Sequence, residues 1–174
     1  DTSLIDAFHR DIDIHSKTAS EILGKAIDEI SPNERRAAKA VNFGLLYGMS
    51  AFGLARQLKI SQFDAKAYVD RYFDSYPSVY DYMQNTKNQA IENGFVQTIL
   101  GRQLYTPDVK SNKHAVKEAA LRAAINAPLQ GSAAEIIKLA MIAVNGLLPD
   151  YNANLLLQVH DELVFEVDSE IAET

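Results

Sequence analysis

The clearest local signal in the sequence is a helix start at Ser31. Ser31 is a favourable N-cap residue, Pro32 suits the first helical position, and Glu34 stands three residues after the cap, which is the spacing of a capping box. The helix that begins here can continue to Tyr47, because the next residue, Gly48, favours termination. We therefore expect a helix with a defined start over this segment.

Gly, Pro and Asn residues divide most of the remaining chain into further helical stretches. One of these should end near Asn126, because Pro128 disfavours a helical conformation at the residue before it. Beyond it, apolar residues at helical spacing predict a helix that packs into the core. The expected helices cover residues 14–23, 50–58, 61–76, 77–92 and 113–125, and the apolar stripe consists of Ile136, Ile137, Ala140, Met141, Val144, Leu147 and Leu148.

Strand-like patterns are confined to the middle and the end of the chain. Residues 95–100 and 103–105 can form a small hairpin around Gly101. Near the end, apolar residues alternate on both sides of the segment 160–162, which predicts a second hairpin with acidic residues at its bend. The alternating residues are Leu155, Leu157, Val159, Leu163, Phe165 and Val167. The expected fold class is therefore α+β and predominantly helical.

The composition excludes several classes of protein. With 174 residues, of which 47% are hydrophobic and 23% charged, the chain has the balance of a globular protein rather than a disordered tail or a coiled coil. It contains no cysteine, which excludes a disulfide scaffold and a thiol nucleophile. The longest uncharged run, residues 40–55, is shorter than the roughly 18–20 apolar residues of a membrane span. We therefore expect no membrane partner and a cytoplasmic location.

The charge balance argues against nucleic-acid binding over the whole surface. The 17 Lys and Arg residues face 23 Asp and Glu residues, so the formal net charge is −6. Binding to phosphates rests on cations that displace counterions, so any such role must be local. The chain has two basic clusters, one of Arg35, Arg36 and Lys39 and one of Lys110, Lys113, Lys117 and Arg122.

In the capped helix, two cations and two aromatic residues share one face. Each residue advances about 100°, so positions four apart stay within a sector of about 120° over this length. The face consists of Arg35, Lys39, Phe43 and Tyr47, and Ala37, Ala38, Val41, Gly44 and Leu45 lie on the opposite, apolar side. Two interpretations remain open. The face is either a solvated stripe whose aromatic residues pack on a neighbouring helix, or a platform that pairs phosphates with cations and stacks a base on an aromatic ring.

Two further groups of polar residues are candidates for chemistry. Asp161 and Glu162 stand beside His160 at the expected bend, where carboxylate oxygens can hold a hard divalent cation, although Asp is also an ordinary turn residue. A second group recurs every four residues and can hydrogen-bond sugar or phosphate, but Pro128 interrupts it. It consists of Arg122, Asn126 and Gln130.

Several stretches of the sequence resemble family A DNA polymerases of bacteria, in the order of that family. They are RRAAKAVNFGLLYG at 35–48, which resembles the fingers helix, MSAFGLA at 49–55, INAPLQG at 125–131 and QVHDEL at 158–163. The resemblance covers essentially the whole chain and implies a fragment of the right-hand polymerase fold. Residues 1–127 would be mainly fingers, with the small hairpin near 95–105. Residues 128–174 would be a partial palm, made of a long helix and a β-hairpin.

The resemblance also implies roles for individual residues. Lys39 and Arg35 would grip the phosphates of an incoming deoxynucleoside triphosphate with help from His15, Phe43 would lie against its sugar and base, and Tyr47 would stack at the templating position. Primer-template DNA would be held by Arg122, Asn126, Gln130 and His160. Asp161 would bind catalytic Mg²⁺ with Glu162 beside it, so that Asp161, Glu162 and Lys39 form the catalytic set.

Two-metal phosphoryl transfer needs carboxylates from separate segments. In the family, the second essential Asp opens a D-Y-S-x-I-E-L-R motif upstream of the fingers. The segment from Asp1 to Asp6 imitates this motif, but it begins only 14 residues before His15, about half of the family's interval. We therefore expect the second Asp to be missing from this chain, the isolated chain to be inactive, and the exposed edge of its palm hairpin to favour non-native self-association.

Two other functions remain as alternatives. A non-catalytic nucleic-acid-binding module of the same fold would keep the basic face without polymerisation. A purely structural helical protein would show no magnesium-dependent affinity for nucleotides.

Overall fold

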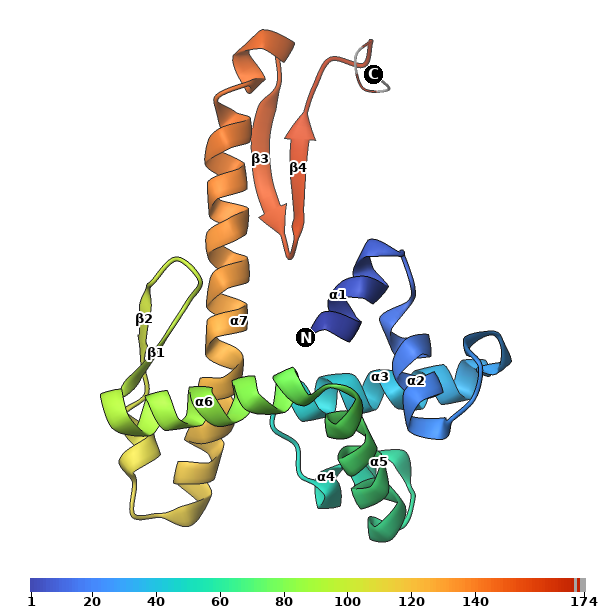
Figure 1. Ribbon diagram of the computed structural model, residues 1–174. Coiled ribbons are helices and arrows are strands. Elements are labelled where there is room, and N and C mark those ends of the chain that lie inside the picture. The colour runs from blue at the N-terminus through green and yellow to red at the C-terminus, as the bar shows by residue number, and fades with distance from the viewer. Residues whose placement is uncertain (171, 173–174) are drawn as a thin grey trace. The chain divides into compact units, whose positions relative to one another are not determined.

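The computed structural model describes residues 1–170 and 172, and it shows a mostly helical chain with two small β-hairpins (Figure 1). The α+β, predominantly helical fold class is thereby confirmed. The chain divides into two compact units. The first unit consists of residues 1–96 and 103–127, and the second of residues 97–102 and 128–174.

The first unit begins with a run of helices. They are α1 (Thr2–His9), α2 (Ile14–Leu23), the 3₁₀ helix η1 (Ile27–Glu29), α3 (Pro32–Leu46), α4 (Ala51–Leu58), α5 (Gln62–Ser75) and α6 (Pro77–Asn93). The small sheet follows as β1 (Phe95–Gln97) and β2 (Gln103–Tyr105), and then come the 3₁₀ helix η2 (Pro107–Lys110) and the start of α7 (His114–Asn145). The helices expected over 14–23, 50–58, 61–76 and 77–92 are confirmed to within a residue or two at their ends. The helix α1 was not expected.

The helix α3 starts as its sequence predicts. The Ser31 hydroxyl accepts a hydrogen bond from the Glu34 amide at 3.3 Å, and the Glu34 carboxylate accepts one from the Ser31 amide at 2.9 Å, which completes the capping box. Pro32 occupies the first turn. The helix ends at Leu46, and Gly48 follows with a φ of +71°, a conformation that glycine adopts without strain.

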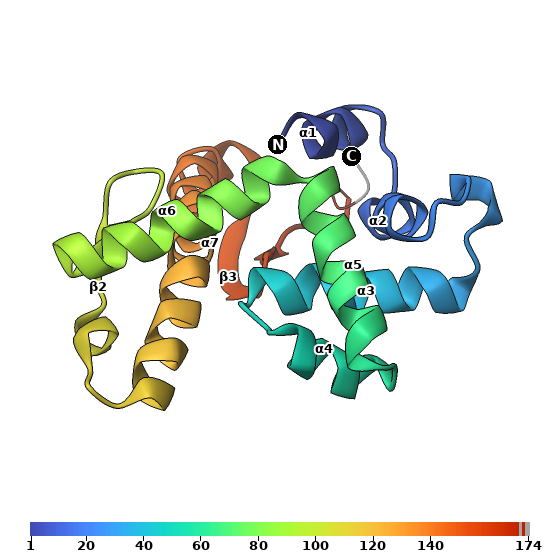
Figure 2. The ribbon, with the colours of Figure 1, turned by 60° about the horizontal axis from the view of Figure 1, so that its bottom comes forward.

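The apolar side of α3 forms the centre of the first core. It packs against α2, α4 and α5, whose arrangement around it can be followed in Figure 2. Two buried tyrosines from the end of α5 close this core with their rings in edge-to-face contact at 5.1 Å. The buried members of the cluster are Ile22, Val41, Leu45, Leu54, Ala55, Ala65, Tyr72 and Tyr76. The sequence-based assignment of the α3 faces is confirmed, because Ala38, Val41, Gly44 and Leu45 are buried and Ala37 is half-buried.

A second, smaller core in the same unit joins α6, β1, η2 and the first half of α7. Its buried members are Ala90, Val96, Val109, Leu121 and Ala124. The Tyr82 hydroxyl of α6 donates a hydrogen bond to the Ile125 carbonyl at 2.8 Å. α6 is thereby tied to α7 through a backbone carbonyl as well as through apolar contacts.

The expectation that a helix ends near Asn126 is wrong, because α7 continues through Pro128 to Asn145. A proline inside a helix lacks an amide donor and weakens the hydrogen bonds of the preceding turn. The amide that Pro128 lacks would have donated to the Ala124 carbonyl, and the Tyr82 hydroxyl donates to the neighbouring Ile125 carbonyl in the same turn. Tertiary packing therefore overrides the local preference for a helix end.

The second unit contains the rest of α7, the 3₁₀ helix η3 (Leu148–Tyr151) and the hairpin of β3 (Asn154–Val159) and β4 (Glu162–Glu166). β3 lies beside the C-terminal part of α7 (Figure 1). Residues 97–102 are attached to α7 by a hydrogen bond from the Ile99 amide to the Ser132 hydroxyl at 3.0 Å. An ion pair between Arg102 and the buried Glu135 at 2.7 Å adds a second link.

The C-terminal hairpin is confirmed, but the expected alternation within it is wrong. β3 and β4 are antiparallel, with Leu155 opposite Phe165 and Leu157 opposite Val164, so Leu156 is an extra residue in a β-bulge. The bulge places Leu155 on the opposite face from Leu157. One face therefore carries Leu155 and Phe165 and the other Leu157 and Val164.

The apolar stripe at the end of α7 was expected to be core, and this is wrong for the described residues. Ile136 is 54% exposed and Leu147 57% exposed, and the other five members of the stripe are half-buried. The reason is geometric, since a two-stranded hairpin covers too little of the helix surface in this unit. Among the described residues, α7 is also the one helix whose length and composition would allow it to cross a membrane, a test that core helices also pass.

An ion pair joins the start of α2 to α3. Asp13 is the N-cap of α2, and its carboxylate accepts hydrogen bonds from Arg35 Nε at 2.9 Å and Arg35 Nη2 at 2.7 Å. The paired guanidinium holds the pKa of Asp13 well below its usual range, and the carboxylate raises the pKa of Arg35 in turn. The two-pronged geometry is the strong form of such a pair.

We predict that Asp13→Asn lowers the unfolding temperature by about 1–3 °C at pH 7 and that this difference shrinks in acid. The amide can still cap α2, so the change removes mainly the charge. A carboxyl whose pKa is lowered on folding stabilises the protein above its ordinary pKa, near 4, and this contribution is lost as the pH falls further.

Thermal unfolding followed by circular dichroism at pH 7 and at pH 2.5 tests this. In an Arg35→Gln background, Asp13→Asn should have little effect at either pH. An equal loss in both backgrounds would show that the carboxylate does not act through Arg35.

Candidate functional site

The outer face of α3 gathers the cation and aromatic residues that the sequence analysis singled out. Phe43 and Tyr47 are 46% and 49% exposed, and Arg35 and Lys39 are exposed as well. The Lys39 ammonium lies 5.8 Å from the centre of the Phe43 ring, within the range of a cation–π interaction. These four side chains therefore lie outside the core, to which the opposite side of α3 contributes.

The helix α2 adds His15 to this face. Its ring centre is 5.7 Å from that of Phe43. Burial lowers the pKa of His15, and the nearby cations Arg35 and Lys39 lower it further against the opposing effect of Asp13. The lowered pKa favours the neutral imidazole. His15, Lys39 and Phe43 form one cluster, called the α3 cluster below.

Arg35 is engaged by a residue that sequence reasoning did not single out. The Asp13 carboxylate takes the Arg35 Nε and Nη2 donors, while a guanidinium carries five N–H donors in all. Asp13 thus competes with any anion for part of this side chain. The sequence could have indicated that Asp13 caps α2, because Asp is a favoured N-cap residue and stands two positions before His15. It does not indicate the contact with Arg35.

Tyr47 lies next to a close contact between α3 and α7. A Cβ atom on Gly48 would meet Arg122 Cγ at 2.6 Å, so the aliphatic part of the Arg122 side chain rests directly on this glycine. The positive φ of Gly48 is a second reason for glycine at this position. Arg122 is exposed, and Asn126, one turn further along α7, is half-buried. The structure thus brings Arg122 to the end of the α3 face.

In the second unit, Gln130 shares a groove with two residues of the hairpin turn. The groove has a volume of about 360 Å³ and is lined on the α7 side by Gln130, Ala133, Ala134 and Ile137 and on the hairpin side by Gln158, His160 and Asp161. His160 has a φ of +55°, which is unusual for a residue with a side chain. The Gln158 amide donates a hydrogen bond to the His160 carbonyl at 2.7 Å and stabilises this turn. Gln158 was not identified by sequence reasoning.

The residues expected to hold a metal ion are Asp161, in the turn, and Glu162, the first residue of β4. Both are exposed, and carboxylate oxygens are the donors that Mg²⁺ prefers. They therefore fit such an ion in donor type. Within residues 1–170 and 172, no group of three or more His, Asp or Glu residues is arranged to hold a metal.

The expected site residues thus fall into two sets. The first unit contains His15, Arg35, Lys39, Phe43, Tyr47, Arg122 and Asn126, and the second contains Gln130, His160, Asp161 and Glu162. Within the first set, the α3 cluster is compact and Arg35 is held by Asp13. Within the second, Gln130, His160 and Asp161 share one groove, which Glu162 does not line.

The chain is similar in sequence to DNA polymerases I of bacteria and in structure to a polymerase domain. The DNA polymerase I of Pseudomonas aeruginosa is 51% identical over 99% of this chain, and that of Bacillus caldotenax is 50% identical over 98%. The chain spans about a fifth of the length of these relatives, 19% and 20% respectively. A solved structure of the polymerase domain of Pol1 from M. smegmatis, in complex with DNA primer-template and dNTP, matches 95% of this chain. The match has a TM-score of 0.90 and 49% identity, and it covers 30% of that chain.

The family assignment follows from the whole length of the sequence. The model of DNA polymerase family A matches residues 1–174, the same residues that carry the α3 cluster and the hairpin turn. The chain belongs to DNA polymerase family A.

Proposed function

We propose that this chain is the fingers and part of the palm of a DNA-directed DNA polymerase, which adds deoxynucleotides to a primer 3′ end on a DNA template. The observation that carries the proposal is the α3 cluster, where the Lys39 cation and the Phe43 ring of an exposed helix face meet the His15 imidazole of α2. In this proposal residues 1–127 belong mainly to the fingers and residues 128–174 to the palm. The enzyme would act in replication and repair, in the cytoplasm.

The incoming deoxynucleoside triphosphate would bind along α3. Lys39 carries an exposed positive charge for its phosphates, and Arg35 has donors beyond the two that Asp13 occupies. Phe43 offers an exposed ring against which sugar and base can pack, with His15 beside it. Tyr47, at the end of the helix, would stack at the templating position.

Primer and template would contact residues from both units. Arg122 and Asn126 of α7 can pair with phosphate and sugar groups, and Gln130 and His160 can do so from the groove of the second unit. These contacts position the duplex rather than read its sequence. Such a role agrees with an enzyme that copies any template.

Asp161 and Glu162 would hold Mg²⁺ at the hairpin turn. Divalent metal dependence goes with the family. Two bound metal ions would supply activation of the primer hydroxyl and neutralisation of charge on the leaving pyrophosphate. The residues of this chain supply carboxylate oxygens at the turn and, in the first unit, Lys39 as a cation for charge that develops on the phosphates. The Gln158–His160 hydrogen bond fixes the backbone that carries Asp161.

A non-catalytic nucleic-acid-binding module of the same fold is the alternative. It would bind DNA through Arg122, Asn126 and Gln130 but would need neither a nucleotide platform nor carboxylates at the turn. Magnesium-dependent binding of a deoxynucleoside triphosphate separates the two functions, since only the polymerase requires it.

For Lys39, we predict that Lys39→Ala reduces nucleotide use by at least about tenfold, because the side chain favours both binding and charge stabilisation. The test is a chimera in which this chain replaces the matching segment of the P. aeruginosa relative. Primer-extension kinetics are compared with those of Arg36→Ala, which removes an exposed cation from the same helix outside the α3 cluster. Equal kinetics for the two variants would contradict the assignment.

For Asp161, we predict that Asp161→Asn in the same chimera lowers the rate of the chemical step by about 100-fold or more while DNA affinity changes little. Removal of a ligand charge disturbs the metal but leaves the phosphate contacts in place. Single-turnover extension and equilibrium DNA binding measure the two effects separately. Parallel losses in both would indicate a structural turn residue instead.

For the chain of 174 residues by itself, we predict no templated incorporation, because Asp161 and Glu162 are neighbours in one hairpin and two-metal chemistry uses carboxylates from separate segments. The β3–β4 sheet has two strands, and Leu157, Val159 and Val164 are exposed on it. Each of the two strands has one outer edge without a partner strand in this sheet, and such edges favour pairing with another copy. Light scattering should therefore detect self-association, which Val164→Lys should reduce. Extension that depends on Asp161, or a monomer at all concentrations, would contradict these two expectations.

A further inference from the structure

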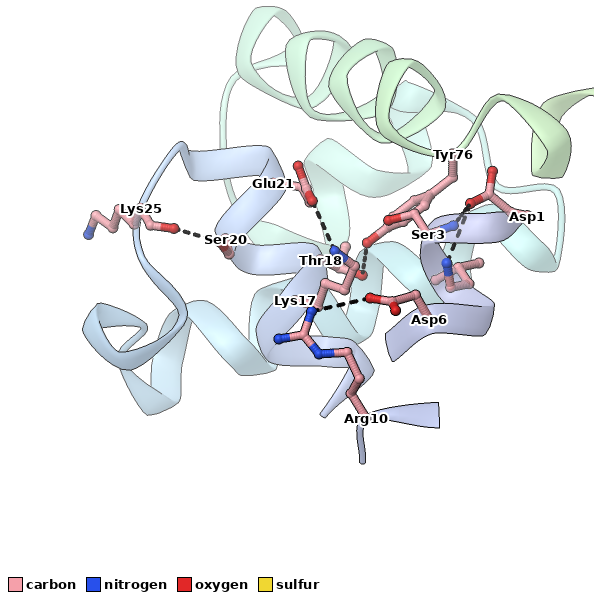
Figure 3. A network of polar contacts seen from close by, with 11 residues as sticks. Asp1, Ser3, Asp6, Arg10, Lys17, Thr18, Ser20, Glu21, Lys25 and Tyr76 are labelled. Atoms are coloured by element: carbon pink, nitrogen blue, oxygen red, sulfur yellow. Dashed lines mark hydrogen bonds and ion pairs between the residues drawn. The ribbon is translucent and has the colours of Figure 1, made fainter. Parts of the chain in front are cut away.

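A chain of buried polar side chains runs from the first core to His15. Thr18 and Tyr76 are fully buried and Asn42 is 6% exposed, so three polar side chains lie among apolar neighbours. The Thr18 hydroxyl donates a hydrogen bond to Asn42 Oδ1 at 3.1 Å and lies 3.5 Å from the Tyr76 hydroxyl, a contact drawn in Figure 3. At the other end, Asn42 Nδ2 lies 3.0 Å from His15 Nδ1.

The direction of these hydrogen bonds decides where the proton of His15 lies. Asn42 uses its oxygen to accept from Thr18, so the end that faces His15 is the NH₂ group, which can only donate. His15 Nδ1 must then be an acceptor without a proton. In a neutral imidazole the proton is therefore on Nε2, the remaining polar atom of the ring.

We propose that Asn42, oriented by Thr18, is a positioning residue that holds His15 as the neutral Nε2–H tautomer and so presents an N–H donor to an anion bound at the α3 cluster. Only the identity of that anion, the triphosphate of a deoxynucleotide, rests on the proposed function. The tautomer follows from the orientation of the Asn42 amide, with Oδ1 toward Thr18 and Nδ2 toward His15. Asn42 and Thr18 do not themselves reach the outer face of α3, since both are buried.

The charges around His15 agree with this arrangement. Arg35 and Lys39 on α3 disfavour a protonated ring, and Asp13 on α2 favours it. Burial adds to the effect of the two cations. A doubly protonated ring would also turn its Nδ1–H toward the NH₂ group of Asn42, so that two donors would face each other. The network therefore resists protonation of His15 through hydrogen bonding as well as through charge.

A buried Asn that merely filled space would have no such effect on the ring. Thr18→Val separates the two roles, because it keeps the shape of the side chain but removes the hydroxyl that orients the Asn42 amide. Thr18→Ser restores the hydroxyl and is the matched control. Asn42→Asp makes the opposite change, since a carboxylate still accepts from Thr18 but can only accept from His15.

The test is two-bond ¹H–¹⁵N correlation spectroscopy of the histidine rings in the 174-residue chain, with His15 assigned by its loss in His15→Gln. We expect a protonated Nε2 and an unprotonated Nδ1 at pH 7.5 in the unmodified chain and in Thr18→Ser. Thr18→Val should give a mixture of tautomers. Asn42→Asp should shift the proton to Nδ1 and raise the pKa of His15 by about one unit. Circular dichroism confirms that each variant is folded.

The outcomes separate this inference from the proposed function. A proton on Nδ1 of the unmodified chain, or an unchanged spectrum in folded Thr18→Val, would overturn the positioning role of Asn42. Addition of a deoxynucleoside triphosphate with Mg²⁺ should shift the His15 Nε2 signal in the unmodified chain. If the tautomer is as expected but this signal does not move, the triphosphate assignment fails while the role of Asn42 stands.

Discussion

The packing of α2 against α3 is the interaction on which the rest of the first unit depends. At its centre the Thr18–Asn42 hydrogen bond satisfies two side chains that would be costly to bury alone, and at its rim Asp13 pairs with Arg35. With α2 held in this way, Val41 and Leu45 of α3 meet the tyrosines of α5 in one core. The same contact places His15 of α2 beside Phe43 of α3. The core of the first unit and the α3 cluster are therefore products of one interface.

Much of α3 could be predicted from the sequence, because its cap and its faces are local properties. The capping box depends on residues three apart, and the two faces follow from a turn of about 100° per residue. Asn42 marks the limit of this reasoning. Its position on the helix is about 340° from Arg35, on the border between the charged face and the apolar side. Its burial depends on where α2 lies, and the periodicity of α3 carries no information about that neighbour.

Two of the wrong predictions, the helix end near Asn126 and the alternation in the C-terminal hairpin, also arise because local patterns carry no information about neighbouring elements. Pro128 disfavours a helix locally, yet α7 continues through it, and Tyr82, far away in the sequence, donates a hydrogen bond to the Ile125 carbonyl in the turn before it. The bulge at Leu156 depends on how β3 pairs with β4, so an alternating pattern read from one strand assigns Leu155 to the wrong face. In both cases contacts with another element bear on the outcome. Patterns within an element predicted its type, and partners across elements decided its end and its register.

The pair of Asp13 and Arg35 also reduces the repulsion between two cations that stand one helical turn apart on α3. Like charges four residues apart destabilise a helix, and Arg35 and Lys39 have this spacing. The Asp13 carboxylate offsets this repulsion by accepting two hydrogen bonds from Arg35. Carboxylate and phosphate present similar oxygen pairs to a guanidinium, so in the proposed function the triphosphate would compete with Asp13 for these donors.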